Sequence, residues 1–444
     1  MTINKKLISG SVWAFSGKLL MTLSGFLINI FLARVLSPEE VGNYFLIISL
    51  ITFTSTFALF GLPKAAVKLI AESFNEQGKI KHIITIVLLM ATLGVFLSAS
   101  ALLFGLNDWL AIELFDAPIL ANLTGIIILW FILFTCQQMM AEIYRGYNDI
   151  KLATLFNGLL TSILSAILLI VFYNSYRVFA LSEVINLIIC AYLISVLFSS
   201  LLLWYKLLPV ANERISMVKA RETLTEISVI AWPLWITSLA LLALTQVDVW
   251  LLGVFRTQEE VAIYSIAARL IIIISIPLIV VNAVIPPIIS QLHAQKNTRK
   301  LQKILRLTAT LSSIPAIIAL GVFIFFGDFI LTFIFGKFYQ SSTEILVILS
   351  IGQTFNVCAG SCGLALMLTK HQITMMLITL FSGLITIITS WYLVYDYGAK
   401  GVATGTTCGI ILQNLLMLLL TRYKLGIWTN LDPFIFFNRK AREQ

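Results

Sequence analysis

Charged residues are scarce in this sequence: only 11% of the 444 residues are Asp, Glu, Lys or Arg, and 59% are hydrophobic. A water-soluble domain needs roughly 25% charged residues to cover its surface. The chain is therefore expected to turn most of its surface to lipid. Its five cysteines and three histidines form neither a CxxC pair nor a zinc-like cluster, so a disulfide framework and a metal site are not expected. A Walker phosphate-binding sequence is also missing, which excludes an ATP-driven pump made of this chain alone.

The hydrophobic residues gather in stretches long enough to cross a bilayer. A membrane of ~30 Å hydrocarbon thickness requires about 20 mostly apolar residues per helix. The sequence predicts an all-α integral membrane protein with about twelve transmembrane helices. We place them at 8–35, 42–62, 83–105, 118–140, 152–173, 180–204, 226–254, 262–288, 308–326, 343–368, 373–395 and 399–421.

The basic residues predict how the chain is oriented. If the N-terminus is cytoplasmic, most of the 30 Lys and Arg residues fall in the inward loops. The outward side then receives only Arg34, Arg177, Arg256, Lys337 and Lys400. This bias follows the positive-inside rule and predicts that both termini lie in the cytoplasm. It also accounts for the net charge of +9 without a nucleic-acid partner.

The two halves of the chain repeat each other. Glu39-Glu40-Val41 followed by Tyr44 recurs as Glu259-Glu260-Val261 followed by Tyr264, and shorter patches recur at similar offsets. Six spans per half make the halves parallel repeats, which predicts two six-helix bundles that alternate between inward-open and outward-open states. The expected division is an N-terminal bundle at 1–207, a cytoplasmic linker at 208–223, a C-terminal bundle at 224–425 and a cytoplasmic tail at 426–444.

The residues at the first outward loop carry a family resemblance. The run Phe31-Leu-Ala-Arg-Val-Leu-Ser-Pro-Glu-Glu-Val-Gly42, with Gly61-Leu62-Pro63 and Arg145-Gly146 further on, resembles polysaccharide exporters of the multidrug/oligosaccharidyl-lipid/polysaccharide flippase superfamily, specifically Wzx-type O-antigen flippases. The resemblance implies a two-lobed flippase for polyprenyl-diphosphate-linked oligosaccharides, such as the O-antigen units of lipopolysaccharide. It implies the lipid bilayer, the lipid-linked oligosaccharide and other membrane proteins of glycan assembly as partners.

The first predicted span contains a basic residue. Lys18 lies in its inner third, and Thr22 and Asn29 lie on roughly the same face. A charge inside a span costs at least about 2.5 kcal/mol and usually faces a cavity or a partner. We expect Lys18 to bind the diphosphate in a polar lumen that Thr22 and Asn29 help to line. The alternative is a lysine that extends to the cytoplasmic interface.

Two further ionisable residues lie inside spans. Asp248 in the seventh span and Arg269 in the eighth are expected at similar depth, and Ser265 lies one helical turn from Arg269. They could neutralise each other as a structural pair. They could also work together, Arg269 receiving the anionic headgroup while Asp248 acts as its counter-ion or couples transport to H⁺ or Na⁺. No cofactor is expected.

Outside the spans, Lys64 and Arg145 could attract an anionic headgroup at the cytoplasmic face, although they equally fit ordinary topology signals. Two other functions remain open. A multidrug or organic-cation antiporter of the same superfamily would need a carboxylate in its lumen, which Asp248 could supply. A membrane-embedded glycan polymerase or glycosyltransferase would need a longer outward loop than the one that carries Asp108, Glu113 and Asp116.

Overall fold

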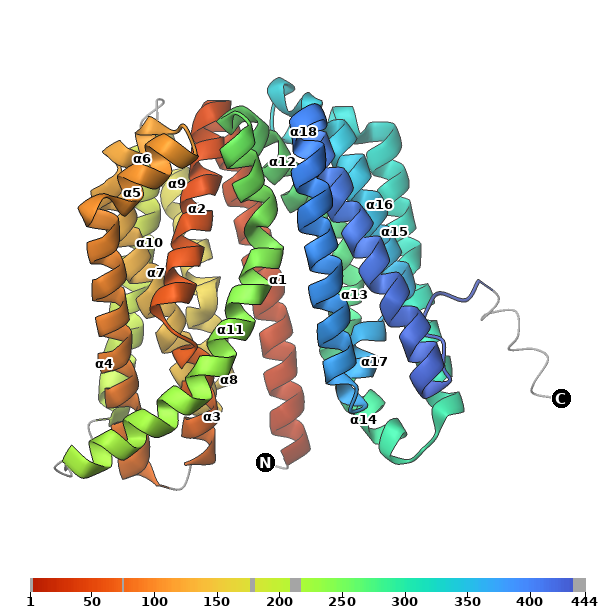
Figure 1. Ribbon diagram of the computed structural model, residues 1–444, viewed down its shortest axis with the longest axis horizontal. Coiled ribbons are helices and arrows are strands. Elements are labelled where there is room, and N and C mark those ends of the chain that lie inside the picture. Colours follow the sequence, from red (N-terminus) through yellow and green to blue (C-terminus); the bar gives the residue numbers. More distant parts are fainter. Residues whose placement is uncertain (1–2, 74–75, 176–179, 208–216, 434–444) are drawn as a thin grey trace. The chain divides into compact units, whose positions relative to one another are not determined.

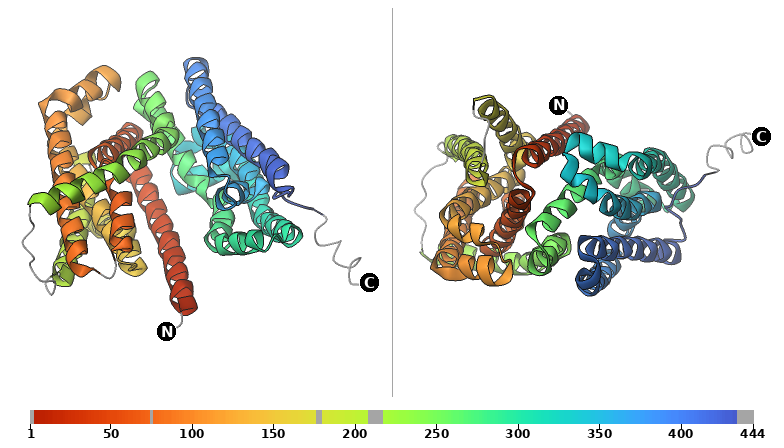
Figure 2. Two further views of the ribbon diagram at one scale, coloured as in Figure 1. Left: turned by 60° about the horizontal axis from the view of Figure 1, so that its bottom comes forward. Right: turned by 90° about the horizontal axis from the view of Figure 1, so that it is seen from above.

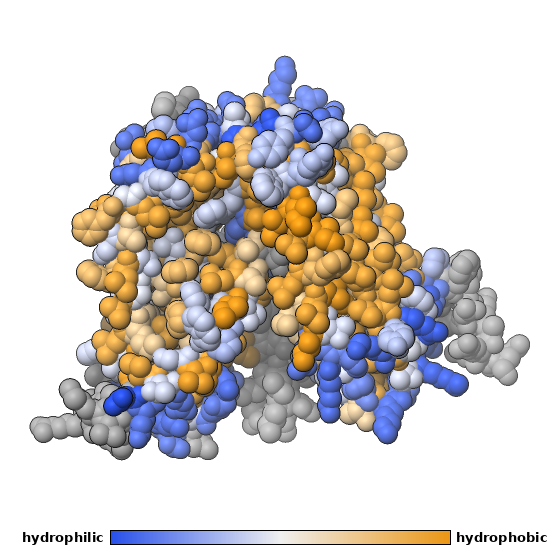
Figure 3. Space-filling view, viewed as in Figure 1, coloured by the Kyte–Doolittle hydropathy of each residue, from blue (hydrophilic) through white to orange (hydrophobic). Residues whose placement is uncertain are grey.

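The structure is a computed structural model that describes residues 3–73, 76–175, 180–207 and 217–433. These residues form helices joined by short connections, and no strand occurs among them (Figure 1). The all-α membrane fold predicted from the hydrophobic stretches is confirmed. On the face drawn in Figure 3, apolar side chains cover the middle of the helices and hydrophilic ones gather near their ends.

The chain divides into two compact units, Met1–Val254 and Phe255–Gln444, which we call unit 1 and unit 2. The α-helices of unit 1 are α1 (Ile3–Val35), α2 (Pro38–Ala58), α3 (Leu62–Glu72), α4 (Gln77–Ala101), α5 (Asn107–Trp109), α6 (Pro118–Asn122), α7 (Thr124–Gly146), α8 (Ile150–Thr154), α9 (Leu160–Ser175), α10 (Leu181–Leu207) and α11 (Met217–Phe255). Single π-helical turns at Leu102–Leu106 and Leu155–Leu159 carry kinks at Gly105 and Gly158.

Unit 2 has fewer helices. Its α-helices are α12 (Gln258–Leu270), α13 (Ile272–Val284), α14 (Pro286–Ala294), α15 (Thr298–Ile334), α16 (Thr343–Ala359), α17 (Cys362–Leu368) and α18 (Gln372–Leu425). Helices α3 and α14 both follow the second span of their half and begin at a Leu-Pro or Ile-Pro step. The predicted cytoplasmic loops at 63–82 and 289–307 therefore contain helical structure.

The structure accounts for twelve spans. Ten helices of the described residues are long and apolar enough to cross a membrane, and the bent pair α12–α13 raises the number to eleven. Helix α18 has 54 residues, about 80 Å at 1.5 Å per residue, which is far longer than one span. It turns at Gly398, and Gly401 then lies against Leu393 and Gly409 against Thr386. Along these contacts the residue numbers rise in one arm of α18 and fall in the other. Helix α18 is therefore an antiparallel pair of spans (Figures 1 and 2).

The second glutamate of each repeated pair makes the same kind of hydrogen bond in both halves. Glu40 at the start of α2 accepts a bond from the backbone N–H of Leu181, at the start of α10, at 3.1 Å. Glu260 in α12 accepts one from Ala399, at the start of the second arm of α18, at 2.9 Å. Each glutamate thus caps the sixth span of its own half, because the first N–H groups of a helix have no partner within it. The repeat expected from the sequence is therefore a repeat of contacts.

Removing either cap is expected to cost about 1 kcal/mol, the usual cost of losing a helix N-cap. Glu260→Ala should lower the thermal unfolding midpoint of the detergent-purified protein by about 1 °C. Glu40→Ala should lower it further, because Glu40 also accepts a bond from the Ser37 backbone N–H at 2.9 Å in the capping box of α2. Glu39→Ala and Glu259→Ala are the controls, since both neighbouring side chains are exposed and neither holds the cap. Equal shifts in controls and caps would contradict this account.

The division of the structure differs from the division expected from the repeat. Helix α11, expected to open the C-terminal bundle, packs with unit 1. Gly61 has φ +73 and lies directly against the α11 backbone at Ala231, and Trp235 donates its indole N–H to the Thr56 carbonyl at 3.2 Å. The bundle limits 1–207 and 224–425 stay a prediction about the repeat. Residues 208–216 of the predicted linker and 434–444 of the predicted tail lie outside the described residues.

Candidate functional site

The side chain of Lys18 on α1 is exposed. Gly17 is buried and lies against Thr154 of α8, whereas the neighbouring Lys18 is exposed. The Thr22 hydroxyl donates to the Lys18 carbonyl at 2.9 Å, and Thr22 and Asn29 are half-buried. Lys18 is therefore accessible, as a residue that binds an anionic headgroup must be.

Asp248 lies on the side of α11 that faces away from α2. Gln246 and Trp250 both bind Ser49 of α2, at 3.0 and 2.7 Å. Residues two positions away from Asp248 on a helix point to roughly the opposite side. Asp248 is half-buried, and the bonds that hold α11 to α2 leave the carboxyl group on the other side of the helix.

Arg269 and Ser265 are one turn apart on α12, but the structure separates their environments. Arg269 is exposed and comes just before the bend at Ile271, whereas Ser265 is only 4% exposed. Ser265 was expected to line a lumen. Its burial among the helices of unit 2 makes it inaccessible in this conformation, and its role stays a prediction. Asp248 belongs to unit 1 and Arg269 to unit 2, so their pairing also stays a prediction.

Lys64 and Arg145 are exposed, and both are already hydrogen-bonded. The Lys64 ammonium group donates to Ser238 of α11 at 3.1 Å, and Arg145 forms an ion pair with Glu142 at 2.7 Å. They carry positive charge at the end of unit 1 that is predicted to be cytoplasmic. Nearby, burial raises the pKa of Tyr147 to about 12, so its phenol stays neutral at physiological pH.

A continuous row of aromatic rings fills the seam between α2 and α11. Ring centroids follow one another at 5.5 Å from Phe115 to Trp250, 5.0 Å to Phe53, 6.5 Å to Phe57, 5.2 Å to Trp235, 4.6 Å to Phe60 and 5.6 Å to Trp232. Aromatic pairs at these separations add to the free energy of burial. The row explains why α11 stays with unit 1.

Unit 2 contains polar contacts that the sequence did not single out. Gln353 of α16 accepts a bond from Ser275 of α13 at 3.1 Å and another from Asn356 at 3.2 Å. Ser361 donates to Asn282 of α13 at 2.7 Å. The signal was present in the repeat, because Ser55 and Gln138 of unit 1 form the same serine–glutamine bond at 3.1 Å.

The break between α16 and α17 is covered by the segment that follows α18. Gly360 has φ +74 and ends α16, which leaves the last carbonyls of that helix without partners inside it. Thr429 donates to the Ala359 carbonyl at 3.0 Å, and Leu431 donates to the Cys358 carbonyl at 2.8 Å. This segment, 426–432, replaces the missing helical hydrogen bonds.

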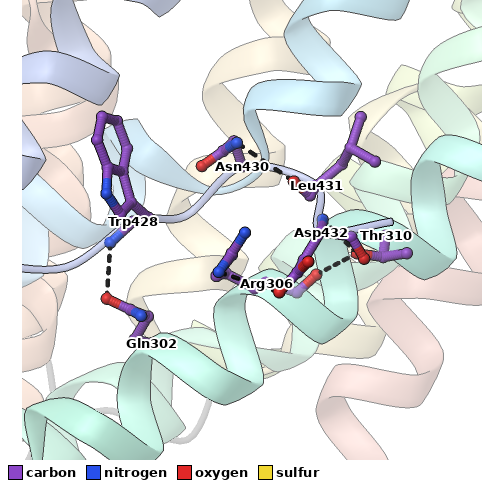
Figure 4. A network of polar contacts seen from close by, with 7 residues as sticks. All are labelled: Gln302, Arg306, Thr310, Trp428, Asn430, Leu431 and Asp432. Carbon is purple, nitrogen blue, oxygen red and sulfur yellow. Dashed lines mark hydrogen bonds and ion pairs between the residues drawn. The ribbon is translucent and has the colours of Figure 1, made fainter. Parts of the chain in front are cut away.

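The same segment forms an ion pair and hydrogen bonds with α15 (Figure 4). Asp432 forms an ion pair with Arg306 at 3.0 Å, and its backbone N–H donates to the Thr310 hydroxyl at 2.9 Å. The backbone N–H of Trp428 donates to Gln302 at 3.0 Å. Residues 426–432, the described start of the predicted tail, are therefore an ordered part of unit 2.

The described residues contain no group of three or more His, Cys, Asp or Glu side chains that could hold a metal ion. A family model described as "Polysaccharide biosynthesis protein" matches residues 7–293, which is more than half of the chain. The chain belongs to the polysaccharide biosynthesis protein family. A second family model, described as "MatE", matches residues 233–392.

One relative by sequence and two solved structures resemble this chain over nearly its whole length. A protein of Shigella flexneri named "Putative O-antigen transporter" is 27% identical over 430 residues, covering 93% of this chain and 96% of the relative. A multidrug resistance MATE family transporter in an inward-facing conformation has a TM-score of 0.74 at 14% identity, covering 94% of this chain and 98% of that structure. The lipid II flippase MurJ has a TM-score of 0.63 at 16% identity, covering 92% and 87%.

The two structural likenesses show the fold, and the sequence matches show the family. The chain is a multi-pass membrane protein with the fold of these transporters. The expectations of an all-α membrane fold with about twelve spans and of membership in a family of polysaccharide exporters are confirmed.

Proposed function

We propose that this family member is a flippase that moves polyprenyl-diphosphate-linked oligosaccharide units of an O-antigen type from the cytoplasmic to the outer leaflet. The observation that carries the proposal is the match along nearly the whole chain to a relative named as an O-antigen transporter. The exposed Lys18 on α1 supports it, because a diphosphate requires a cation where a drug cation would require a carboxylate.

In this proposal the diphosphate is held by cationic side chains while the polyprenyl chain stays in lipid. Lys18 and Arg269, both exposed, bind the diphosphate, and Thr22 and Asn29 contribute polar lining. Lys64 and Arg145 attract the headgroup at the cytoplasmic face, where both termini also lie. Asp248 is the counter-ion of this site, or the group through which an H⁺ or Na⁺ gradient drives transport.

The test is deletion of the gene in its source bacterium, followed by extraction of the lipids. We expect a polyprenyl-diphosphate oligosaccharide to accumulate while the surface glycan disappears, because synthesis continues after export stops. Complementation with the wild-type gene should restore the glycan. Normal surface glycan without a trapped intermediate, in a strain shown to have no second exporter, would contradict the proposal.

The second candidate function is a multidrug or organic-cation antiporter. Two observations favour it: Asp248 is a half-buried carboxyl group in α11, and the residues matched by the "MatE" family model include it. In that case the deletion strain would keep its glycan and become more sensitive to organic cations.

A further inference from the structure

The two halves share one polar contact and then differ around it. Ser55–Gln138 in unit 1 and Ser275–Gln353 in unit 2 are the same bond between the second and fourth spans, each at 3.1 Å. This pair aligns α7 with α16. Because both halves descend from the same fold, differences next to the pair are not requirements of that fold.

Around the shared bond, the two units carry different polar side chains, and the buried amide of Gln137 in unit 1 donates to the Phe156 carbonyl at 2.9 Å. With Gln138 aligned to Gln353, Ala141 of unit 1 aligns with Asn356 of unit 2. Ala141 is 0% exposed, whereas Asn356 is half-buried. In the alignment of the two halves, Asn282 corresponds to residues 59–62 of unit 1, a stretch without an amide side chain. Unit 2 thus carries two amide side chains at places where unit 1 has none.

The backbone departs from the repeat at the same place. In each unit, the helix that carries the repeated glutamine is followed by a turn at a non-glycine residue with positive φ, Asn148 in unit 1 and Lys370 in unit 2. The stretch from Gln353 to Lys370 is longer than the stretch from Gln138 to Asn148. The extra length holds the break at Gly360. The break follows the 17 residues of α16, about 25 Å along the helix, and so lies past the bilayer midplane. Gln353 lies ten residues into α16, about 15 Å along the helix, so it is near midplane depth.

The amides have hydrogen-bonding capacity left over. Gln353 accepts two bonds through its oxygen, Asn356 donates one and the Asn282 oxygen accepts one. Within the described residues, the Gln353 amide nitrogen, the Asn356 oxygen and the Asn282 nitrogen have no partner. All three side chains are half-buried rather than sealed, so a ligand could reach them. An amide offers both donors and an acceptor to such a ligand.

The cluster is uncharged, which decides the kind of ligand. Helices α13 and α17 carry no Asp or Glu, and Glu344 of α16 is ion-paired with Lys400 near the start of that helix. A cation held at midplane depth without a carboxylate would be poorly compensated. Neutral hydroxyl groups fit paired donors and acceptors. We propose that Asn282, Gln353 and Asn356 form a binding site for sugar hydroxyl groups of the transported saccharide, which rests on the proposed flippase function.

The test compares two lipids on the purified full-length protein in nanodiscs. One is the lipid-linked oligosaccharide extracted from the deletion strain, and the other is undecaprenyl diphosphate without sugar. Asn356→Ala introduces the residue that unit 1 already carries at this place. It should raise the Kd for the sugar-bearing lipid about fivefold, the size expected for one lost neutral hydrogen bond. The Kd for undecaprenyl diphosphate should not change.

Asn414→Ala is the matched control, since this buried amide of α18 donates to the Ile410 carbonyl within its own helix and its oxygen accepts from the Cys362 thiol at 3.8 Å. It should leave the ratio of the two Kd values as in wild type, and Asn282→Ala should change that ratio as Asn356→Ala does. If the Asn356 and Asn282 variants lose affinity equally for both lipids, or lose none, the sugar site is overturned. The flippase function would still stand in that case, because the wild type binds the sugar-bearing lipid. Failure of the wild type to bind the sugar-bearing lipid would overturn both.

Discussion

Replacing Gly405 by leucine is expected to destabilise the folded protein. An added Cβ at Gly405 would lie 2.7 Å from the backbone nitrogen of Ser390, on the facing arm of α18. Backbone cannot move aside as a flexible side chain can, so the two arms would have to separate. Overpacking of this kind costs about 3 kcal/mol, which should lower the unfolding midpoint of a 444-residue chain by roughly 3 °C. Size-exclusion elution and thermal unfolding of the detergent-purified protein measure it.

Gly321→Leu is the control for this prediction. Gly321 lies within α15, and no atom outside its own helix backbone comes within 4 Å of the place where its Cβ would be. The same substitution there should leave elution and unfolding nearly unchanged. Equal damage at both positions would show that leucine, rather than the contact between the arms, is responsible.

Reversing the charge of Lys18 is expected to remove most transport. Under the proposed function the Lys18 ammonium group holds a diphosphate, and a hydrogen bond to a charged group contributes about 1.5–3 kcal/mol. That range corresponds to roughly a 10- to 100-fold loss. Lys18→Glu should reduce flipping in proteoliposomes by at least this factor, since it adds repulsion to the loss.

Lys18→Arg and Lys151→Glu are the matched variants. Arginine keeps the charge and should retain most of the flipping rate. Lys151 is an exposed lysine on α8 near the ring of Trp13, so its reversal tests whether any basic residue of this region matters. If Lys18→Glu flips as fast as wild type, the extended-lysine alternative holds and the diphosphate is bound elsewhere.

The spans and the repeat could be predicted because they follow from local composition. Hydrophobic stretches of sufficient length must be helical in lipid, and Glu40 and Glu260 recur in the sequence as well as in the structure. Even the last two spans were separated correctly, since the turn at Gly398 lies between the predicted spans 373–395 and 399–421.

The environments of single residues could not be predicted. Helical spacing places Ser265 and Arg269 on one face, but only packing against neighbouring helices decides that Ser265 is buried while Arg269 is exposed. The position of α11 depended on its aromatic contacts with α2, which a repeat-based division cannot detect.

Contacts between distant segments were also beyond the sequence. The Asn282 and Asn356 amides lie in stretches that read simply as membrane spans. The segment 426–432 reads as a polar tail, yet it completes the hydrogen bonds of a helix some 70 residues earlier, as in the bond from Thr429 to Ala359. Such pairings depend on where a helix breaks, and no local pattern fixes that.

Proteoliposomes that contain only the purified protein test the central claim most directly. The lipid-linked oligosaccharide from the deletion strain is incorporated into both leaflets, and a membrane-impermeant enzyme that modifies the sugar is added outside. Wild-type protein should make nearly all of the lipid accessible, whereas protein-free vesicles should stop near one half. Accessibility that stays near one half with wild-type protein, with and without an imposed H⁺ or Na⁺ gradient, would contradict the flippase function.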